Sequence, residues 1–289
     1  MRTPISPKPE ADGTYGPSSL ALRLATDKVT DYDGHVYANA HTGDGKILMI
    51  CTEEKAMTMA NGKQFSTGNH PVEMMVPMLH LIAAGFDIEV ATPTGAPAQI
   101  EMWAMPREDR AVMELYDDFK DQFESPRPLS DFVATSMHED SPYRAVYLPG
   151  GHGAMLGLPE NPDVGKVLHW AHERGLLTLS LCHGPAALLA ADLPEARGED
   201  SSAGFLYDGY EMAVFPDAVD KQTPMIGYMP GHMPWKFGER LSALGVTIIN
   251  KKSNGTCHID RDLVTGDGPK AANQFGRLAA DALLKRDNQ

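Results

Sequence analysis

The sequence has few cysteines and lacks a long apolar run. Its three cysteines, Cys51, Cys182 and Cys257, lie far apart and form no CxxC pair. That pattern argues against a disulfide framework or a zinc ribbon and indicates reduced thiols. No apolar run reaches the roughly 20 residues that span a bilayer, and residues 1–16 lack the apolar segment of a secretory signal. We therefore expect a cytoplasmic protein with no membrane contact.

Basic residues are also scarce. Lys and Arg total 25 against 39 Asp and Glu, which gives a formal net charge of −14. A surface this acidic repels phosphate backbones and anionic lipid, so a stable complex with nucleic acid is not expected. The length of 289 residues suits one large α/β domain with additions.

The chain divides near residue 45. Residues 1–45 are rich in Pro, Gly, Asp and Thr and show no sustained periodicity. We interpret them as an N-terminal extension that lies on the body of the protein or at a subunit contact. Residues 46–289 form the expected catalytic domain.

Strands and helices alternate through that domain. Continuous apolar runs predict strands buried on both faces, and apolar residues at helical spacing predict the intervening helices. This alternation is typical of a doubly wound, mostly parallel sheet, which binds ligands beyond the carboxyl ends of its strands. The predicted strands are 46–52, 87–92, 144–151, 176–181, 210–215, 246–250 and 262–266, and the predicted helices are 71–85, 108–123, 162–175, 184–191, 234–244 and 270–286.

The sharpest local signal is the segment SLCHGPAALLAA. An apolar strand ends at Leu181, Cys182 follows, and Gly184 lets the chain turn at once into a helix. This is the form of a nucleophile elbow. A thiol at a helix N-terminus is stabilised as a thiolate, with its pKa lowered from about 8.5. The alternative is a buried structural cysteine.

Three further segments carry candidate groups. In LPGGHGAM, Gly150 and Gly151 expose backbone N–H groups at a strand end, which suits an oxyanion hole or only a tight turn. Glu73 lies at about the third position of a helix, where an acid is often part of a cap. Asp217 and Asp220 open another helix, and local sequence does not choose between them.

Taken together, STGNHPVE, VYLPGGHGAMLGLPE, SLCHGPAALLA and FPDAVDKQTPMIGYMPGH resemble the ThiJ/PfpI superfamily, and within it the HchA-type chaperones with glyoxalase III activity. The resemblance runs from about Lys46 to the C-terminus. It implies a flavodoxin-like core with a small additional lobe, a homodimer and a Cys–His–acid site.

The resemblance also assigns roles. Cys182 matches the nucleophile, His183 the adjacent histidine and Asp220 the acid that orients it, while Glu73 matches the carboxyl group beside the thiol. Gly151 and His183 would supply backbone N–H groups to an oxyanion.

The family's metal site is not expected here. Some HchA-type proteins hold a metal with two histidines and a carboxylate, and the matching positions are Ile82, Asp87 and Phe119, which cannot form that site. We expect no metal and no cofactor. The stretch 191–209 is also longer than the family pattern, which predicts a different pocket rim.

The leading hypothesis is conversion of a 2-oxoaldehyde such as methylglyoxal into a 2-hydroxy acid without glutathione. The same groups would hydrolyse methylglyoxal or glyoxal adducts in a deglycase reaction that protects against stress. Two alternatives stay open. One is an ATP-independent holding chaperone for unfolded clients, with the Met-rich segments (Met57, Met59, Met74, Met75 and Met78) as an exposed patch or, by the simpler interpretation, as core. The other is a cysteine aminopeptidase or glutaminase.

Overall fold

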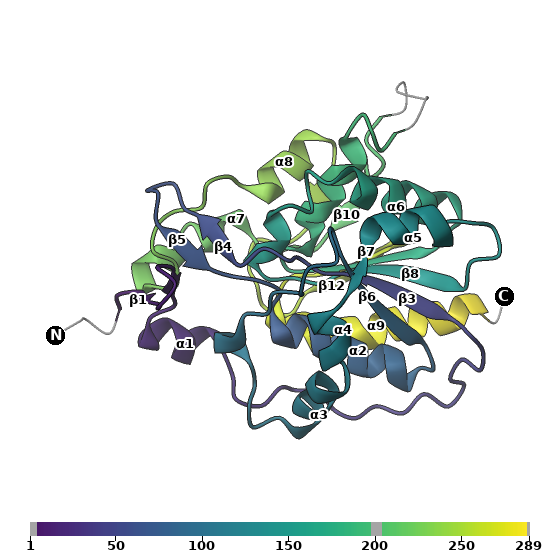
Figure 1. Cartoon of the computed structure of the whole chain (residues 1–289), viewed down its shortest axis with the longest axis horizontal. Coiled ribbons are helices and arrows are strands. Elements are labelled where there is room, and N and C mark those ends of the chain that lie inside the picture. The colour runs from purple at the N-terminus through teal and green to yellow at the C-terminus, as the bar shows by residue number, and fades with distance from the viewer. Residues whose placement is uncertain (1–4, 198–203, 288–289) are drawn as a thin grey trace.

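The computed structural model describes residues 5–197 and 204–287, and within them a seven-stranded sheet forms the centre of the fold (Figure 1). Its order is β12-β13-β9-β8-β3-β6-β7, and all neighbouring pairs are parallel except β12 and β13. The five inner strands, counted along the chain, follow the flavodoxin-like order 2-1-3-4-5. The predicted α/β fold is confirmed. The bounds are β3 Lys46–Ile50, β6 Asp87–Thr92, β7 Arg127–Pro128, β8 Tyr143–Leu148, β9 Leu177–Leu181, β12 Cys257–Asp260 and β13 Leu263–Gly266.

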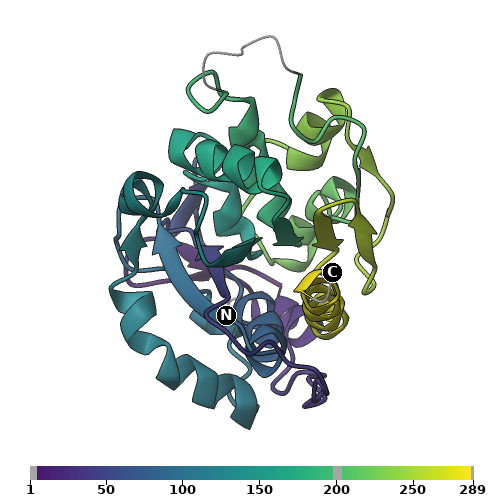
Figure 2. The same ribbon diagram turned by 90° about the vertical axis from the view of Figure 1, so that its right-hand side faces the viewer.

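Side chains of the inner strands alternate between two cores. In β3, Leu48 and Ile50 pack into one apolar cluster, while Ile47 and Met49 pack into the other. A continuous apolar run is required because both faces of the sheet are covered. Helices supply these covers (Figures 1 and 2). On one face lie α2 Pro71–Ala83, α3 Arg110–Asp118, α4 Lys120–Glu124 and α9 Ala272–Asp287, and on the other lie α5 Leu129–Ser136, α6 Pro162–Glu173, α8 Phe237–Ala243 and the 3₁₀ helix η3 Gly184–Asp192.

Three predicted elements differ in the structure. The segment after Cys182 is the 3₁₀ helix η3 and not an α-helix. The predicted strand 210–215 shrinks to β10 Glu211–Met212, which pairs with β11 Thr247–Ile248 in a separate two-stranded sheet. Helix 108–123 is divided at Phe119 into α3 and α4. These segments are apolar enough to be buried, but packing decides their backbone form.

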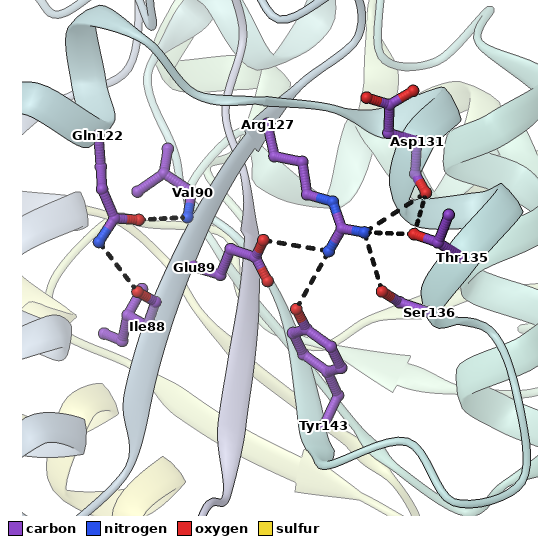
Figure 3. A network of polar contacts seen from close by, with 9 residues as sticks. All are labelled: Ile88, Glu89, Val90, Gln122, Arg127, Asp131, Thr135, Ser136 and Tyr143. Atoms are coloured by element: carbon purple, nitrogen blue, oxygen red, sulfur yellow. Dashed lines mark hydrogen bonds and ion pairs between the residues drawn. The ribbon is translucent and has the colours of Figure 1, made fainter.

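The β6 edge of the sheet is closed by side chains. The Arg127 guanidinium bonds to Glu89 on β6 at 3.1 Å, and to Thr135 and Ser136 on α5 at 2.6 and 3.0 Å (Figure 3). The amide of Gln122 bonds to the backbone of β6 at Val90 N, 3.1 Å away. The Gln122 contact occupies a backbone N–H that an open edge would leave available for unwanted strand pairing.

A second, smaller sheet joins the N-terminal residues to an inserted segment. It contains β1 Lys8–Pro9, β2 Tyr15–Gly16, β4 Ala56–Thr58 and β5 Gln64–Ser66 in the order β1-β2-β5-β4. Helix α1 Ser19–Ala25 follows β2, and its N-cap Ser18 donates through Oγ to the Ile226 carbonyl at 2.8 Å. The first part of the chain is therefore tied to residues near position 226.

The next N-terminal residues cross over α2 and α9. The Tyr37 hydroxyl lies 3.0 Å from His80 Nδ1 on α2, and Arg277 on α9 pairs with Asp33 at 2.8 Å. His41 N donates to the Ala84 carbonyl at 2.8 Å. Segment 31–41 is thus held as a strap by polar contacts.

The Met-rich segments are core. Met57, Met59, Met74, Met75 and Met78 are all buried, so the interpretation of these residues as an exposed client surface is wrong. Among the described residues, no helix combines the length and apolar character needed to cross a bilayer.

Helix α6 packs against η3 at backbone distance. A Cβ at Gly165 would lie 2.2 Å from the Ala190 carbonyl oxygen and 2.4 Å from Ala196 Cβ. Because real Cβ atoms do not approach other atoms this closely, only glycine permits the contact. It fixes η3, and with it the turn that carries Cys182, against the sheet.

We expect Gly165→Ala to lower the free energy of unfolding by about 1–3 kcal/mol, because overpacking outweighs the better helix propensity of alanine. Urea unfolding measures this change. Gly204→Ala is the matched control, since a Cβ at exposed Gly204 meets nothing within 4 Å. A Gly165→Ala protein as stable as the parent would contradict the close contact.

Candidate active site

Cys182 occupies a sharp turn at the carboxyl end of β9. Its φ is +61°, a left-handed backbone conformation that residues other than glycine rarely adopt. Cys182 N donates to the Gly266 carbonyl at 2.8 Å, so β13 fixes the start of the turn. A Cβ at Gly184 would lie 2.3 Å from the Leu148 carbonyl oxygen, which explains the glycine two residues later. The predicted elbow geometry is present.

The turn brings the neighbouring histidine back to the thiol. His183 Nδ1 lies 3.2 Å from Cys182 Sγ, and His183 Nε2 lies 2.8 Å from an Asp220 carboxylate oxygen. Phe215 N donates to the Cys182 carbonyl at 3.0 Å, and the Phe215 ring stacks on the His183 ring with centroids 4.8 Å apart. The structure therefore aligns Cys182, His183 and Asp220.

The two aspartates of FPDAVDK have different places. Asp217 accepts from the backbone N–H groups of Gly238 and Glu239 at 3.2 and 2.9 Å, and so caps the start of α8. Asp220, at the end of the short helix α7 Asp217–Asp220, is buried against His183. Local sequence could not separate these roles, but the structure does.

A second histidine, which the sequence analysis did not select, shares the same carboxylate. His152 Nε2 lies 2.9 Å from the other oxygen of Asp220, and the rings of His152 and His183 have centroids 4.0 Å apart. Burial opposes ionisation of Asp220, but the two imidazoles outweigh it and hold the pKa of that carboxyl well below its usual range. In the sequence, the position of His152 in LPGGHGAM, directly after the glycine turn, was the signal that could have identified it as a site residue.

Burial and neighbours push the pKa values of the two imidazoles apart. Burial and the adjacent His152 lower the pKa of His183 to about 4, despite the opposing effect of Asp220. For His152, burial also lowers the pKa, but Asp220 and Glu101 outweigh it and the net shift is upward. His183 is thus suited to accept a proton and His152 to donate one.

Glu73 also lies beside the thiol. It is fully buried in the first turn of α2, and a Cβ at Gly150 would lie 2.0 Å from its Oε2 and 2.6 Å from Cys182 Cβ. The capping interpretation of Glu73 is wrong, because the His70 N–H at the N-cap donates to the Gly150 carbonyl instead. Burial raises the pKa of Glu73 to about 8, although contact with the Cys182 thiol opposes the rise.

The pKa of the thiol is shifted in the opposite direction to the sequence-based expectation. Burial raises the pKa of Cys182 well above its usual value, and nearby Glu73 and Asp220 add to the rise, while the Gly151 N–H opposes it. Desolvation in the assembled cavity therefore favours the protonated form of the Cys182 thiol.

Gly150 and Gly151 form the turn between β8 and these groups. Gly151 has a φ of +103°, and a Cβ there would lie 2.4 Å from the Gly68 carbonyl oxygen. The Gly151 N–H lowers the pKa of both Cys182 and Glu73, so it faces the negative charge that either group develops. This is the electrostatic property required of an oxyanion-stabilising N–H.

One cavity of about 530 Å³ is lined by Glu73, Gly151, His152, Cys182 and His183. The N-terminal segment contributes a wall from Leu24 to Asp31, and Phe215, Tyr228 and Lys270 contribute others. The described residues of 191–209 do not line this cavity, while residues 198–203 of that stretch lie outside the described part of the chain. A pocket rim that differs from the family pattern through this stretch stays a prediction.

Metal binding is limited by the ligands present. Ile82 and Asp87 are exposed, Phe119 is half-buried, and two of these three side chains have no ligand atom. His152, His183 and Asp220 present ligand atoms within 4.8 Å of one another among the described residues. However, each Nε2 atom is already engaged by the Asp220 carboxylate.

Comparisons with known proteins place the chain in a family. Residues 64–202 match the model of the DJ-1/PfpI family. The chain is 48% identical over 273 residues to the protein/nucleic acid deglycase HchA of Escherichia coli O157:H7, covering 94% of this chain and 93% of that protein, and equally similar to HchA of strain CFT073.

Solved structures share the fold at lower identity. Glyoxalase III from Candida albicans superposes with a TM-score of 0.61 at 20% identity, over 82% of this chain and 96% of its own. A Francisella tularensis protein described as Rapid Encystment Protein 24 kDa superposes with a TM-score of 0.65 at 19% identity, over 83% and 99%.

The raised pKa of Glu73 predicts a stability cost at high pH. The unfolded chain releases this proton near its ordinary pKa of 4.5, whereas the native chain keeps it until about pH 8. Stability due to this group is therefore present at low pH and is lost as pH rises through that window.

We expect Glu73→Gln to be more stable than the parent at pH 9 by on the order of a few kcal/mol, with a small difference at pH 5. Urea midpoints at the two pH values measure the change, and exposed Glu139→Gln is the control. An equal gain at both pH values would contradict the assigned ionisation.

Proposed function

Because the chain belongs to the DJ-1/PfpI family and is a homologue of the HchA deglycases, we propose that it is a glutathione-independent glyoxalase and deglycase acting through Cys182. The observation that carries this proposal is the presence of two proton-transfer groups beside one thiol. His183 contacts Sγ, and Glu73, with a pKa of about 8, lies next to the same thiol.

The first step is attack on the aldehyde carbon. His183 takes the proton of the thiol, and Asp220 stabilises the imidazolium that forms. The Cys182 sulfur bonds to the carbonyl carbon of a 2-oxoaldehyde, and the oxyanion is stabilised by the Gly151 N–H. His183 returns the proton to this oxygen, which gives a hemithioacetal.

The second step moves hydrogen between adjacent carbons. Glu73 removes the proton from the carbon bonded to sulfur and delivers it to the neighbouring carbon through an enediol, while the hydroxyl proton on the first carbon passes to the carbonyl oxygen on the second. Its pKa lets it exist in both protonation states close to neutral pH. The product is a thioester of a 2-hydroxy acid. Water, activated by His183, then hydrolyses the thioester and regenerates the thiol.

The substrate range follows from the relatives and the cavity. HchA is described as a protein/nucleic acid deglycase, and we infer that glycated amines and thiols on proteins, and glycated bases, react in the same site. A net charge of −14 disfavours a lasting complex with nucleic acid, so contact with such substrates is brief. Methylglyoxal and glyoxal are the small aldehydes concerned.

The cellular setting is part of the proposal. Three unpaired cysteines, one of which is the catalytic thiol, suit the reducing cytoplasm, and the family resemblance favours a homodimer. We propose residues 1–45 as an extension and 46–289 as the catalytic domain with an inserted lobe at β4 and β5. Because the proposed reactions remove reactive aldehydes and their adducts, the protein would protect the cell against aldehyde stress.

Two other functions have less support. A holding chaperone needs an exposed apolar patch, and the Met-rich residues are buried. An aminopeptidase needs a cleft that admits a peptide bond, and Cys182 is only 4% exposed behind the N-terminal wall of the cavity.

We expect Cys182→Ser and Glu73→Gln each to lower methylglyoxal turnover by at least about 100-fold, because each removes a group that bonds to or moves a proton on the substrate. The assay follows lactate formation without glutathione. Cys257→Ser, on the half-buried strand β12, should keep parental activity. Retained activity in either site variant would reject the mechanism.

A further inference from the structure

His152 is held as firmly as the catalytic histidine but has no part in the mechanism above. It is 4% exposed, and its Nε2 contacts Asp220 at 2.9 Å. Its other ring nitrogen, Nδ1, is buried and has no hydrogen-bond partner in the described part of the chain. A buried polar atom without a partner costs about 1–3 kcal/mol, so the free nitrogen is unexplained by stability.

Other unpartnered polar atoms line the same part of the cavity. Nδ1 of His70 and Oε2 of Glu101 are buried without a partner among the described residues, and both residues line the cavity with His152. Thr67 Oγ1 donates to the second oxygen of Glu101 at 2.9 Å, which fixes that carboxyl group. Together His70, Glu101 and His152 form a polar subsite beside Cys182.

This subsite differs from the position of Glu73. Glu73 moves a proton between the two adjacent carbons of the substrate. His152 contacts one oxygen of the Asp220 carboxylate, and His183 contacts the other. Glu101 and Asp220 both favour a proton on His152, while His183 has the opposite tendency. The surroundings thus favour a proton on His152, which lines the cavity, more than on His183, which contacts the thiol.

We propose that His152 is a catalytic acid that protonates the leaving amine of aldehyde–amine adducts, in a subsite it shares with Glu101 and His70. The inference rests on the proposed function, since it assigns the group that makes deglycation of amines possible at this site.

The step balances in atoms and protons. In a carbinolamine adduct, the carbon from the aldehyde carries a hydroxyl group and an N-linked amine. The C–S bond forms as the C–N bond breaks, the thiol proton passes to His183, and a proton from His152 Nδ1 passes to the departing nitrogen. The products are the free amine and the hemithioacetal on Cys182. One imidazole gains a proton and the other loses one, so the cluster around Asp220 keeps its charge.

The chemistry of the leaving group makes an acid necessary for amines alone. An amine cannot leave as its anion and must receive a proton as the bond breaks. A thiol has a pKa of about 8.5 and leaves as a thiolate. Free methylglyoxal has no leaving group at all. The acid is therefore required for only one of the three substrate classes.

The acidic cavity mouth favours the same class. Asp27 and Asp31 of the N-terminal segment line the cavity with the single basic residue Lys270. An amine released from lysine, with a pKa of about 10.4, is a cation in water. Carboxylates at the mouth attract the parent lysine or arginine side chains and their released products.

The test compares substrates in His152→Gln. Glutamine places an N–H donor near the position of Nε2 and so keeps a bond to Asp220, but it cannot transfer a proton. The carbinolamine of Nα-acetyl-lysine and methylglyoxal is used with an excess aldehyde trap, which sets spontaneous dissociation as the background. Release of Nα-acetyl-lysine above that background measures direct reaction. Lactate formation from methylglyoxal, and from its hemithioacetal with N-acetylcysteine, is measured in parallel.

We expect amine release by His152→Gln to fall by about 100-fold or more, as for loss of a general acid. Turnover of methylglyoxal and of the thiol adduct should fall by a smaller factor, because replacing one of the two imidazoles on Asp220 disturbs His183 equally in every reaction, whereas only the amine adduct also loses its acid. Exposed His138→Gln is the matched control and should match the parent on all three substrates. An equal fall on all three, or no fall on the amine adduct, would overturn the proposal.

The two proposals fail in different ways. If the parent enzyme releases no amine above background but converts methylglyoxal, the deglycase part of the proposed function is wrong for amines. If the parent releases amine and His152→Gln does so equally well, only the role of His152 is wrong.

Glu101→Gln gives an independent measurement. It keeps the shape and the bond to Thr67 but removes one of the two carboxylates that face His152. The other charged or titratable groups around this ring are Asp220, His183, His70 and Tyr228. The pH above which amine release declines should move to a lower value, while that for methylglyoxal should not. The same shift for both substrates would contradict an acid specific to amines.

Discussion

The site depends on one carboxylate shared by two imidazoles. Asp220 is buried, and each of its oxygens contacts the Nε2 atom of a different histidine. A buried carboxylate is costly unless such bonds compensate it. Its charge fixes both rings, and their unequal surroundings then divide proton acceptance from proton donation. Elements far apart in the sequence, β8, β9 and α7, are brought together by this interaction.

Two other features of the site are energetically unfavourable. Cys182 has a strained backbone, and Glu73 lies in a dry position where its charged form is disfavoured. The parallel sheet supports these costs because its strands end at one edge, with apolar cores on both faces. The reactive groups are thus placed at the most rigid part of the fold, where small displacements are resisted.

Sequence reasoning predicted the fold because continuous apolar runs such as 46–52 and 87–92 indicate strands that are buried on both faces of a sheet. It found the elbow because Cys182 and Gly184 flank a turn that few sequences form. It could not choose between Asp217 and Asp220, since both open the same helix, and only the approach of α8 separates them. It missed the role of His152 because the partner Asp220 is 68 residues away. It misjudged the thiol because desolvation is a property of the assembled cavity.

The N-terminal segment gives the cavity a wall that is independent of the catalytic scaffold. Residues 24–31 line the cavity, while the following strap is fastened to α2 and α9 by contacts such as Arg277 with Asp33. None of these residues bonds to the reacting atoms. Substrate size and the dryness of the thiol can therefore diverge between related enzymes through changes in this peripheral segment alone, with the catalytic groups kept constant.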